Sequence, residues 1–151
     1  MLLLHGLGGH VGEWADTADG MKDRARVVAF DARGHGRSER RPEDVSREAH
    51  VADVAFVIEQ LELGPVVVVG QSPGGVTALL VAAEHPELVR AGNGVVEPAD
   101  AEEMCARAPD VRLVELVGAE HDLHLDRPEE WCQALTEFLD SLDDAAPDRD
   151  Q

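Results

Sequence analysis

The feature that most constrains this chain is an apolar segment that runs directly into a glycine-flanked serine. Residues 66–69 are four consecutive valines, a pattern typical of a strand buried on both faces of a parallel sheet. The next six residues read GQSPGG, and the Ala-, Leu- and Val-rich stretch from Val76 to Glu84 predicts a helix. The sequence therefore predicts a strand, a sharp turn and a helix in immediate succession.

The turn between them fits the pattern G-x-S-x-G, with Gly70 and Gly74 on either side of Ser72. A strand that reverses into a helix brings backbone against backbone, so a Cβ two residues from the serine would collide. We expect Ser72 at the apex in a strained conformation, with its hydroxyl exposed near the positive end of the helix. The alternative is an ordinary strand-to-helix turn that contains a serine. The strand and helix around the pattern favour a nucleophile elbow.

Strands and helices alternate along the first part of the chain. Apolar runs predict strands at 1–4, 26–31 and 66–69, and helical patterns predict helices at 13–24, 46–63 and 76–84. The first helix is expected at the surface and interrupted by Gly20, and the second is expected to begin at an N-cap, Ser46. This order predicts a doubly wound parallel sheet with right-handed crossovers.

Beyond Pro86 the pattern is less regular. Residues 87–91 either end a helix or begin a strand, and Gly92-Asn93-Gly94 predicts a turn. The remaining expected elements are a helix at 98–108, a strand at 111–117, a loop at 118–126 and an amphipathic helix from Pro128. That last helix is expected to turn four residues inward, namely Trp131, Leu135, Phe138 and Leu139. We predict one domain over residues 1–142 and an acidic, disordered tail at 143–151.

Charge and cysteine content limit the partners and the compartment. The formal net charge is −18 at pH 7, which repels nucleic acid and anionic membranes, so neither is expected as a partner. The sequence contains no apolar stretch of transmembrane length, and the run at 1–4 is too short for a signal peptide. Cys105 and Cys132 lack CxxC spacing and are expected to be free thiols in a reducing compartment. Together these features predict a cytoplasmic protein.

Four segments, in the same order along the chain, resemble those of the α/β-hydrolase family. They are residues 5–9 (HGLGG), similar to its oxyanion loop, 31–38 (DARGHGRS), similar to its D-x-R-G-x-G-x-S segment, 70–75 (GQSPGG), similar to its elbow, and 118–128, similar to its C-terminal G-x-x-H loop. Together the four are much more specific than any one of them. The resemblance implies a reduced α/β-hydrolase-like parallel sheet with helices on both faces and no lid domain.

The resemblance also implies roles for individual residues. Ser72 would be the nucleophile, His121 the general acid and base, and the backbone N–H of Leu7 one donor of the oxyanion hole. No cofactor or metal is expected, and the substrate would be a small ester or related acyl compound. His5 and His35 match non-catalytic positions of the family and are expected to shape the loops around the pocket.

His121 is preferred to His124 as the catalytic histidine because it directly follows the loop at the end of a strand, where the family places that residue. His124 with Asp122 and Asp126 could instead form a metal cluster, although no further ligands with suitable spacing accompany them. The simplest expectation for His124 is a solvated loop residue.

Two departures from the family bear on catalysis. The acid of a Ser–acid–His triad should lie between Ser72 and His121, but the turn at 91–94 contains no carboxylate, which leaves Glu97 and Asp100 as candidates. Pro73 occupies the position whose N–H is normally half of the oxyanion hole, and proline has no N–H.

A third departure is length, because the chain passes within a few residues from the elbow helix to what resembles a later strand. We infer an internal deletion near 88–91 that removed the lid, and the start at Met1 lacks the family's leading strands. Sheet edges exposed in this way predict self-association, either as a homodimer or as poor solubility. Two functions stay open: a serine hydrolase of small esters, and a catalytically impaired, truncated relative that acts as a binding or interaction module.

Overall fold

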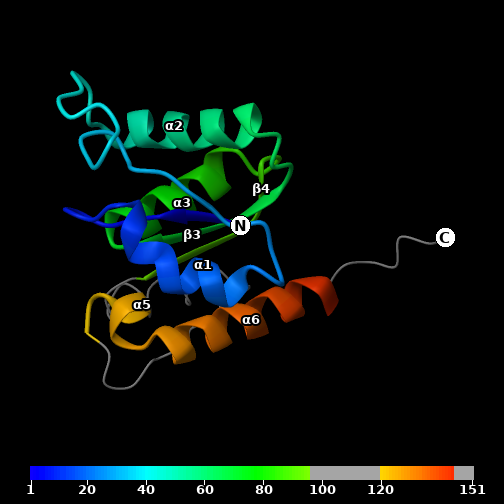
Figure 1. Ribbon diagram of the computed structural model, residues 1–151. Helices are drawn as coiled ribbons and strands as arrows, with labels where there is room; N and C mark the ends of the chain where they lie inside the picture. The colour runs from blue at the N-terminus through cyan, green and yellow to red at the C-terminus, as the bar shows by residue number, and fades with distance from the viewer. Residues whose placement is uncertain (96–119, 145–151) are drawn as a thin grey trace.

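A four-stranded parallel sheet lies at the centre of the protein, in the computed structural model that describes residues 1–95 and 120–144 (Figure 1). The strand order is β2-β1-β3-β4, and every neighbouring pair is parallel. The strands are β1 (Leu2–Leu4), β2 (Val28–Ala29), β3 (Val66–Gln71) and β4 (Val89–Val95). The predicted parallel sheet is confirmed, and the loops after its strands meet at one edge because the strands all run in the same direction.

Helices cover both faces of the sheet, as predicted. They are η1 (Val11–Trp14), α1 (Ala15–Met21), α2 (Arg47–Gln60), α3 (Pro73–Glu84), α5 (Leu123–Asp126) and α6 (Pro128–Asp144). In Figure 1, α2 and α3 lie on one face, and α1, α5 and α6 lie on the other. The molecule is therefore a three-layer α/β sandwich.

Alternation along the central strands divides the apolar residues between the two faces. Leu2 and Leu4 of β1 belong to one core cluster, together with residues of α2 and α3, while Leu3 belongs to the other. In β3, Val66 and Val68 join the first cluster, and Val67 and Val69 join the second. All residues of both strands are buried, which explains the consecutive apolar residues of β1 and of Val66–Val69 in β3.

Local signals place the helix starts. The Ser46 side chain accepts a hydrogen bond from the N–H of Ala49 at 3.2 Å, so the predicted N-cap of α2 is confirmed. Helix α6 begins at Pro128 and turns Trp131 and Leu135 into the core, with Phe138 and Leu139 packed against them. This arrangement agrees with the amphipathic pattern.

Two sequence-based predictions are wrong. Gly92-Asn93-Gly94 lies inside β4, because pairing with the buried β3, Val68 to Gly92 and Gly70 to Gly94, outweighs its turn propensity. Gly20 does not interrupt α1; a Cβ there would lie 2.7 Å from the Sγ of Cys132 on α6, so its small size permits close helix packing. Helix α1 is a surface helix, as predicted: Thr17 and Met21 are buried on its inner face, and most of its other residues are exposed.

The C-terminal boundaries also shift. The segment predicted as a loop at 118–126 contains the short helix α5, and α6 continues to Asp144, two residues past the predicted domain end. The predictions for 98–108 and 111–117, together with Cys105, lie outside the described residues. No helix in the described ranges is long and apolar enough to cross a membrane.

Candidate active site

Ser72 stands at the junction of β3 and α3 in a strained backbone conformation. Its φ is 52° and its ψ is −123°, and it is one of two non-glycine residues with positive φ in the described ranges. Such a conformation costs about 1–3 kcal/mol and persists only where the surrounding structure enforces it. A Cβ on Gly70 would lie 2.2 Å from backbone atoms of Gly74, and one on Gly74 would lie 2.3 Å from the Leu4 carbonyl oxygen. The predicted turn geometry and the steric need for both glycines are therefore confirmed.

Pro73 is the first residue of α3, where proline is favoured because the N–H it lacks would have no partner within the helix. The first N–H of α3 therefore belongs to Gly74. Leu7 follows β1, the strand paired with β3 through Leu4 and Gly70, and its side chain is 85% exposed. Leu7 and Pro73 line the same pocket, so the loop after β1 faces the start of α3.

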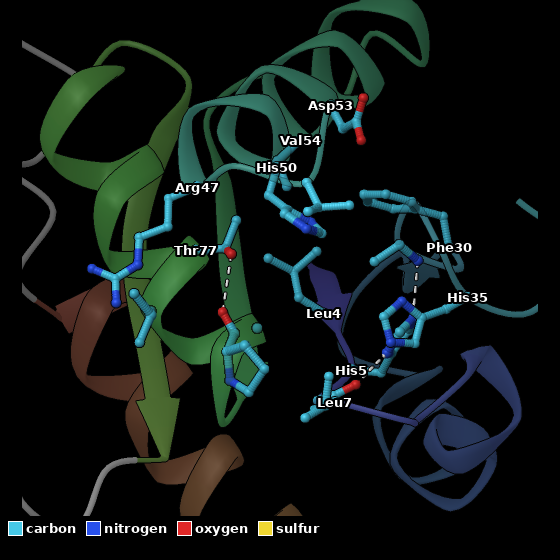
Figure 2. Close-up of a pocket in the computed structure, with 16 residues that line it drawn as sticks. Leu4, His5, Leu7, Phe30, His35, Arg47, His50, Asp53, Val54 and Thr77 are labelled. Atoms are coloured by element: carbon cyan, nitrogen blue, oxygen red, sulfur yellow. Dashed lines mark hydrogen bonds between the residues drawn. The ribbon is translucent and has the colours of Figure 1, made fainter. Parts of the chain in front are cut away.

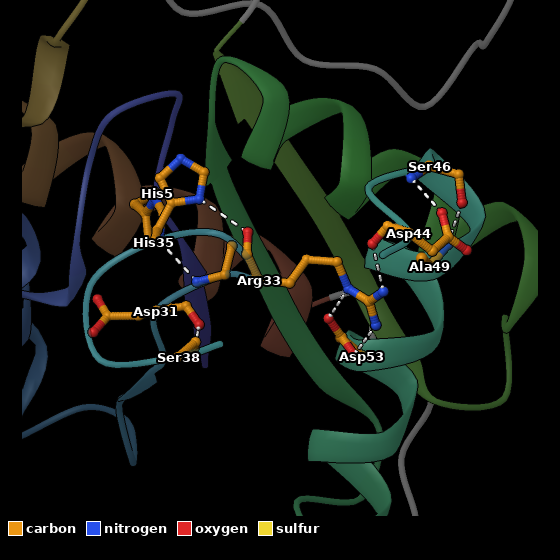
Figure 3. A network of polar contacts seen from close by, with 10 residues as sticks. His5, Asp31, Arg33, His35, Ser38, Asp44, Ser46, Ala49 and Asp53 are labelled. Atoms are coloured by element: carbon orange, nitrogen blue, oxygen red, sulfur yellow. Dashed lines mark hydrogen bonds and ion pairs between the residues drawn. The ribbon is translucent and has the colours of Figure 1, made fainter. Parts of the chain in front are cut away.

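Two histidines connect the loops after β1 and β2. The Nε2 atom of His5 accepts a hydrogen bond from the N–H of Ala32 at 2.9 Å, and that of His35 accepts one from the N–H of Gly8 at 3.3 Å. Each Nδ1 lies within hydrogen-bond distance of a backbone carbonyl, at 2.8 Å and 3.1 Å. Since Nε2 accepts in both rings, both imidazoles are neutral and donate from Nδ1. These contacts give both residues the loop-shaping position that the resemblance implied (Figure 3).

Two carboxylates anchor the loop after β2. Asp31 is buried and accepts hydrogen bonds from the N–H groups of Val11 at 2.7 Å and Arg37 at 2.8 Å, which hold its pKa below the usual range. Asp53 binds the Arg33 guanidinium through two bonds, at 2.6 Å and 2.7 Å, and this pairing raises the pKa of Arg33 (Figure 3). The loop after β2 is therefore fixed to η1 at one point and to α2 at another.

The loop that carries His121 is attached to the elbow by a side chain that sequence reasoning missed. The Nε2 atom of Gln71 donates to Asp122 Oδ1 at 2.9 Å and to the His121 carbonyl oxygen at 3.3 Å. Gln71 is 3% exposed, and its Oε1 occupies the space that a Cβ on Gly6 would need. The residue immediately before Ser72 thus contacts both the loop after β1 and the His121 loop. Its place inside the G-x-S-x-G pattern was the available signal.

His124 is buried, so the expectation of a solvated residue is wrong. It is 1% exposed and stacks on Trp14 with ring centroids 4.1 Å apart. Its Nε2 lies 3.6 Å from Glu13 Oε1, and neither ring nitrogen has a hydrogen bond to the described part of the chain. Burial lowers the pKa of His124, against the opposing effect of Glu13 and the nearby aspartates.

The described residues contain no group of three His, Cys, Asp or Glu side chains that could hold a metal ion, and this includes the candidate cluster around His124. The two candidate triad acids, Glu97 and Asp100, lie outside the described residues. Cys132 is a half-buried free thiol whose pKa is raised by burial.

A pocket of about 230 Å³ opens beside the elbow (Figure 2). Its walls come from the loops after β1 and β2 and from the first turns of α2 and α3. Leu7, Pro73 and Gly74 border it on the elbow side, and Thr77 lies one helical turn further along α3. The arrangement offers a mostly apolar space next to a strained, partly exposed serine.

Comparison with known proteins identifies the family. A family model described as alpha/beta hydrolase fold matches residues 1–92. The chain belongs to the alpha/beta-hydrolase family. The match includes the loops after β1 and β2 and the whole elbow, so the predicted family and fold class are confirmed.

Similar alpha/beta hydrolases include the mouse sn-1-specific diacylglycerol lipase ABHD11, which is 42% identical over 91 residues, 59% of this chain and 29% of that protein. The chain thus spans about a third of the length of the curated relatives it matches. Among solved structures, a thermophilic esterase from Thermogutta terrifontis has a TM-score of 0.80 at 18% identity, covering 93% of this chain and 89% of that one. The E-2-(acetamidomethylene)succinate hydrolase has a TM-score of 0.59 at 28% identity, covering 71% and 42%.

Proposed function

We propose that this protein is a serine hydrolase of small esters or related acyl compounds. The observation that carries the proposal is the conformation of Ser72, whose positive φ at the end of a buried strand is maintained by the close packing of two glycines. A strained apex serine beside an apolar pocket is the arrangement expected of an activated nucleophile. The names of the relatives, a lipase, an esterase and a hydrolase, favour the same class.

In the proposed reaction, Ser72 Oγ attacks the ester carbonyl carbon while His121 takes the hydroxyl proton. The oxyanion that forms is stabilised by the Leu7 N–H. The tetrahedral intermediate then collapses, the alcohol leaves with the proton held by His121, and an acyl-enzyme remains on Ser72. Water, deprotonated by His121, attacks this ester; the bond to Ser72 Oγ then breaks, His121 returns the proton to Ser72, and the acid is released. The Gln71 contacts support the pairing, because they connect the His121 loop to the residue next to the nucleophile.

The acid that orients His121 is proposed to be Glu97 or Asp100. An unoriented imidazole would lower turnover by about 10⁴. Each candidate can be replaced in turn by its amide, in Glu97→Gln and Asp100→Asn. The variant that loses ester hydrolysis identifies the acid.

A fluorophosphonate probe tests the proposal. We expect labelling of the wild-type protein at Ser72 and none in Ser72→Ala or His121→Ala. Labelling that persists in His121→Ala would overturn the role of that histidine. Folded wild-type protein that does not label would overturn the hydrolase proposal.

The second candidate function is a binding module that has lost catalysis, and Pro73 is the observation that favours it. A missing oxyanion donor costs about 10² to 10³ in rate. Pro73→Ala restores an N–H at this position, and we expect ester hydrolysis to rise about 10²-fold, with a stability change of about 1 kcal/mol or less. If the variant and the wild type are both inert towards esters and probe, the hydrolase is overturned and the binding module is the remaining candidate.

The remaining expectations belong to the same proposal. A cytoplasmic protein without nucleic-acid or membrane partners is consistent with the charge of −18. A homodimer through a sheet edge stays a prediction, for which β2 is the edge strand on one side of the described sheet. The inferred deletion near 88–91 is also part of this proposal. Sedimentation velocity tests the dimer.

A further inference from the structure

Among the residues that line the pocket beside the elbow, Arg47 carries a positive charge that no neighbouring lining side chain balances. The titratable residues that line the pocket are His5, His35, Arg47, His50 and Asp53. His5 and His35 are neutral, because the Nε2 atom of each accepts a backbone N–H. Neither ring contributes charge to the pocket.

His50 and Asp53 do not compensate Arg47 either. Burial, and secondarily the Arg33 guanidinium, lower the pKa of His50, which favours its neutral form. Both Asp53 carboxylate oxygens are bound to Arg33, at 2.6 Å and 2.7 Å, so this pair contributes no net charge. Arg47 is left as the one uncompensated cation among the described residues that line the pocket.

Arg47 has no hydrogen bond or ion pair with the described residues, in a chain that contains 31 aspartates and glutamates. It is the first residue of the 14-residue helix α2, so the partial positive charge of the helix start adds to that of its guanidinium. Arg47 is exposed, and Figure 2 places its side chain at the edge of the pocket, on the opposite side from His35 and Phe30. An anion in the pocket would therefore find a positive group on one wall only.

The rest of the lining is largely apolar. Three of its residues, Leu7, Val45 and Val76, are large hydrophobic side chains that are 85%, 66% and 38% exposed. Exposed apolar side chains gathered around one opening mark a surface that an apolar group covers. The volume of about 230 Å³ suits a short chain rather than a long lipid tail.

We propose that the pocket binds an ester substrate whose short apolar chain ends in a carboxylate or phosphate-like group, and that Arg47 pairs with this anion. The inference rests on the proposed function, since it names the substrate class of the same site. The planar guanidinium offers two parallel N–H donors to such a group, and the apolar lining accepts the chain between the anion and the ester.

A matched pair of esters tests this assignment. The 4-nitrophenyl ester of hexanoate and the mono-4-nitrophenyl ester of adipate have acyl chains of equal length, and only the second carries a terminal carboxylate. We expect the wild-type kcat/KM to favour the adipate ester. Arg47→Gln should reduce kcat/KM for that ester about 10- to 100-fold and leave the hexanoate ester within about two-fold. A terminal phosphonate analogue of the same length shows which of the two anions is preferred.

Arg41→Gln is the control variant. It changes the net charge of the protein by the same amount as Arg47→Gln, but Arg41 is exposed and lies outside the pocket lining. Equal effects of the two variants, or a wild type that favours the hexanoate ester, would overturn the assignment. Hydrolysis of neither ester, together with no probe labelling at Ser72, would be a failure of the proposed function instead.

If neither ester is hydrolysed, ligand binding to Ser72→Ala, measured by calorimetry, tests the pocket assignment without catalysis. We expect monomethyl adipate to bind, and to bind about ten-fold more weakly when Arg47→Gln is added. Dimethyl adipate, which has no anion, should show no dependence on Arg47. Absence of binding, or equal binding in both proteins, would overturn the inference.

Discussion

Two groups of loops meet at the elbow, and they differ in the hydrogen bonds that hold them in place. The N-terminal loops, residues 5–10 and 31–38, form a closed network in which His5, Asp31 and His35 each bind backbone groups. The His121 loop, residues 120–127, is attached to the elbow by the amide of Gln71 and includes, in the short helix α5, His124, whose ring nitrogens have no hydrogen bond within the described ranges. The wall of the pocket is therefore held by several hydrogen bonds to backbone groups, while the side chain of Gln71 links the His121 loop to the elbow.

The largest expected effect is at the elbow, which both groups of loops contact. Gly70→Ala places a methyl group 2.2 Å from backbone atoms of Gly74 and should lower the free energy of unfolding by about 3 kcal/mol or more. Urea denaturation followed by circular dichroism measures this. Gly64→Ala is the control, because Gly64 also has positive φ, at 63°, but no atom lies within 4 Å of the position that the new methyl group would occupy. It should cost about 1–2 kcal/mol. Equal losses would contradict the steric argument.

The second effect tests the link to the His121 loop. Gln71→Leu removes the donor to Asp122 and the His121 carbonyl, and we expect probe labelling at Ser72 to slow about 10²-fold, because the base is misplaced. Asp122→Asn keeps an acceptor oxygen and should label nearly as fast as wild type, whereas Asp122→Ala should be slower. If Asp122→Asn and Asp122→Ala label alike, the role of Gln71 is structural rather than positioning.

The third effect tests the fixed side of the comparison. Asp31→Ala leaves the N–H groups of Val11 and Arg37 without their acceptor and should cost about 2 kcal/mol at neutral pH. Because the pKa of Asp31 is lowered by folding, its contribution is present above about pH 3.9 and is lost as the pH falls through the lower, folded value. The difference from wild type should therefore shrink in acid. Asp23→Ala, at an exposed position, should change stability little.

The smallest effect is at His124. Folding lowers the pKa of His124. Its contribution to the free energy of unfolding is therefore fully present above about pH 6.5 and is lost as the pH falls below that value, because the unfolded chain binds the proton more readily. The carboxylates of Glu13, Asp122 and Asp126 face the ring and oppose this effect without reversing it. His124→Phe keeps the stack on Trp14 and should reduce the fall in Tm between about pH 7.5 and about pH 5.5. His85→Gln, at the end of α3, serves as control. An unchanged slope in His124→Phe would contradict the assignment.

The elbow could be predicted from the sequence because its signals are contiguous. Four valines, the glycines around Ser72 and the proline that opens α3 act through neighbouring residues, and all of them have the expected geometry. The N-cap at Ser46 and the buried face of α6 are readable for the same reason.

The features that the sequence did not predict depend on contacts between residues far apart in the chain. Gly92-Asn93-Gly94 has the local character of a turn, and only its pairing with β3 makes it a strand. Gln71 contacts Asp122 across 51 positions, and His124 stacks on Trp14, which is even more remote in sequence. No spacing in the sequence encodes these contacts, since they depend on which elements the fold brings together.

The place of β1 in the sheet has a consequence for how the protein is made. Strand β1 lies between β2 and β3, and its Leu2 pairs with Val68, a residue synthesised much later. Until that partner leaves the ribosome, three consecutive leucines expose one unpaired, fully apolar strand edge to the cell. The sheet therefore cannot be completed strand by strand in the order of synthesis. Completion of the sheet must wait for the same segment that carries Ser72.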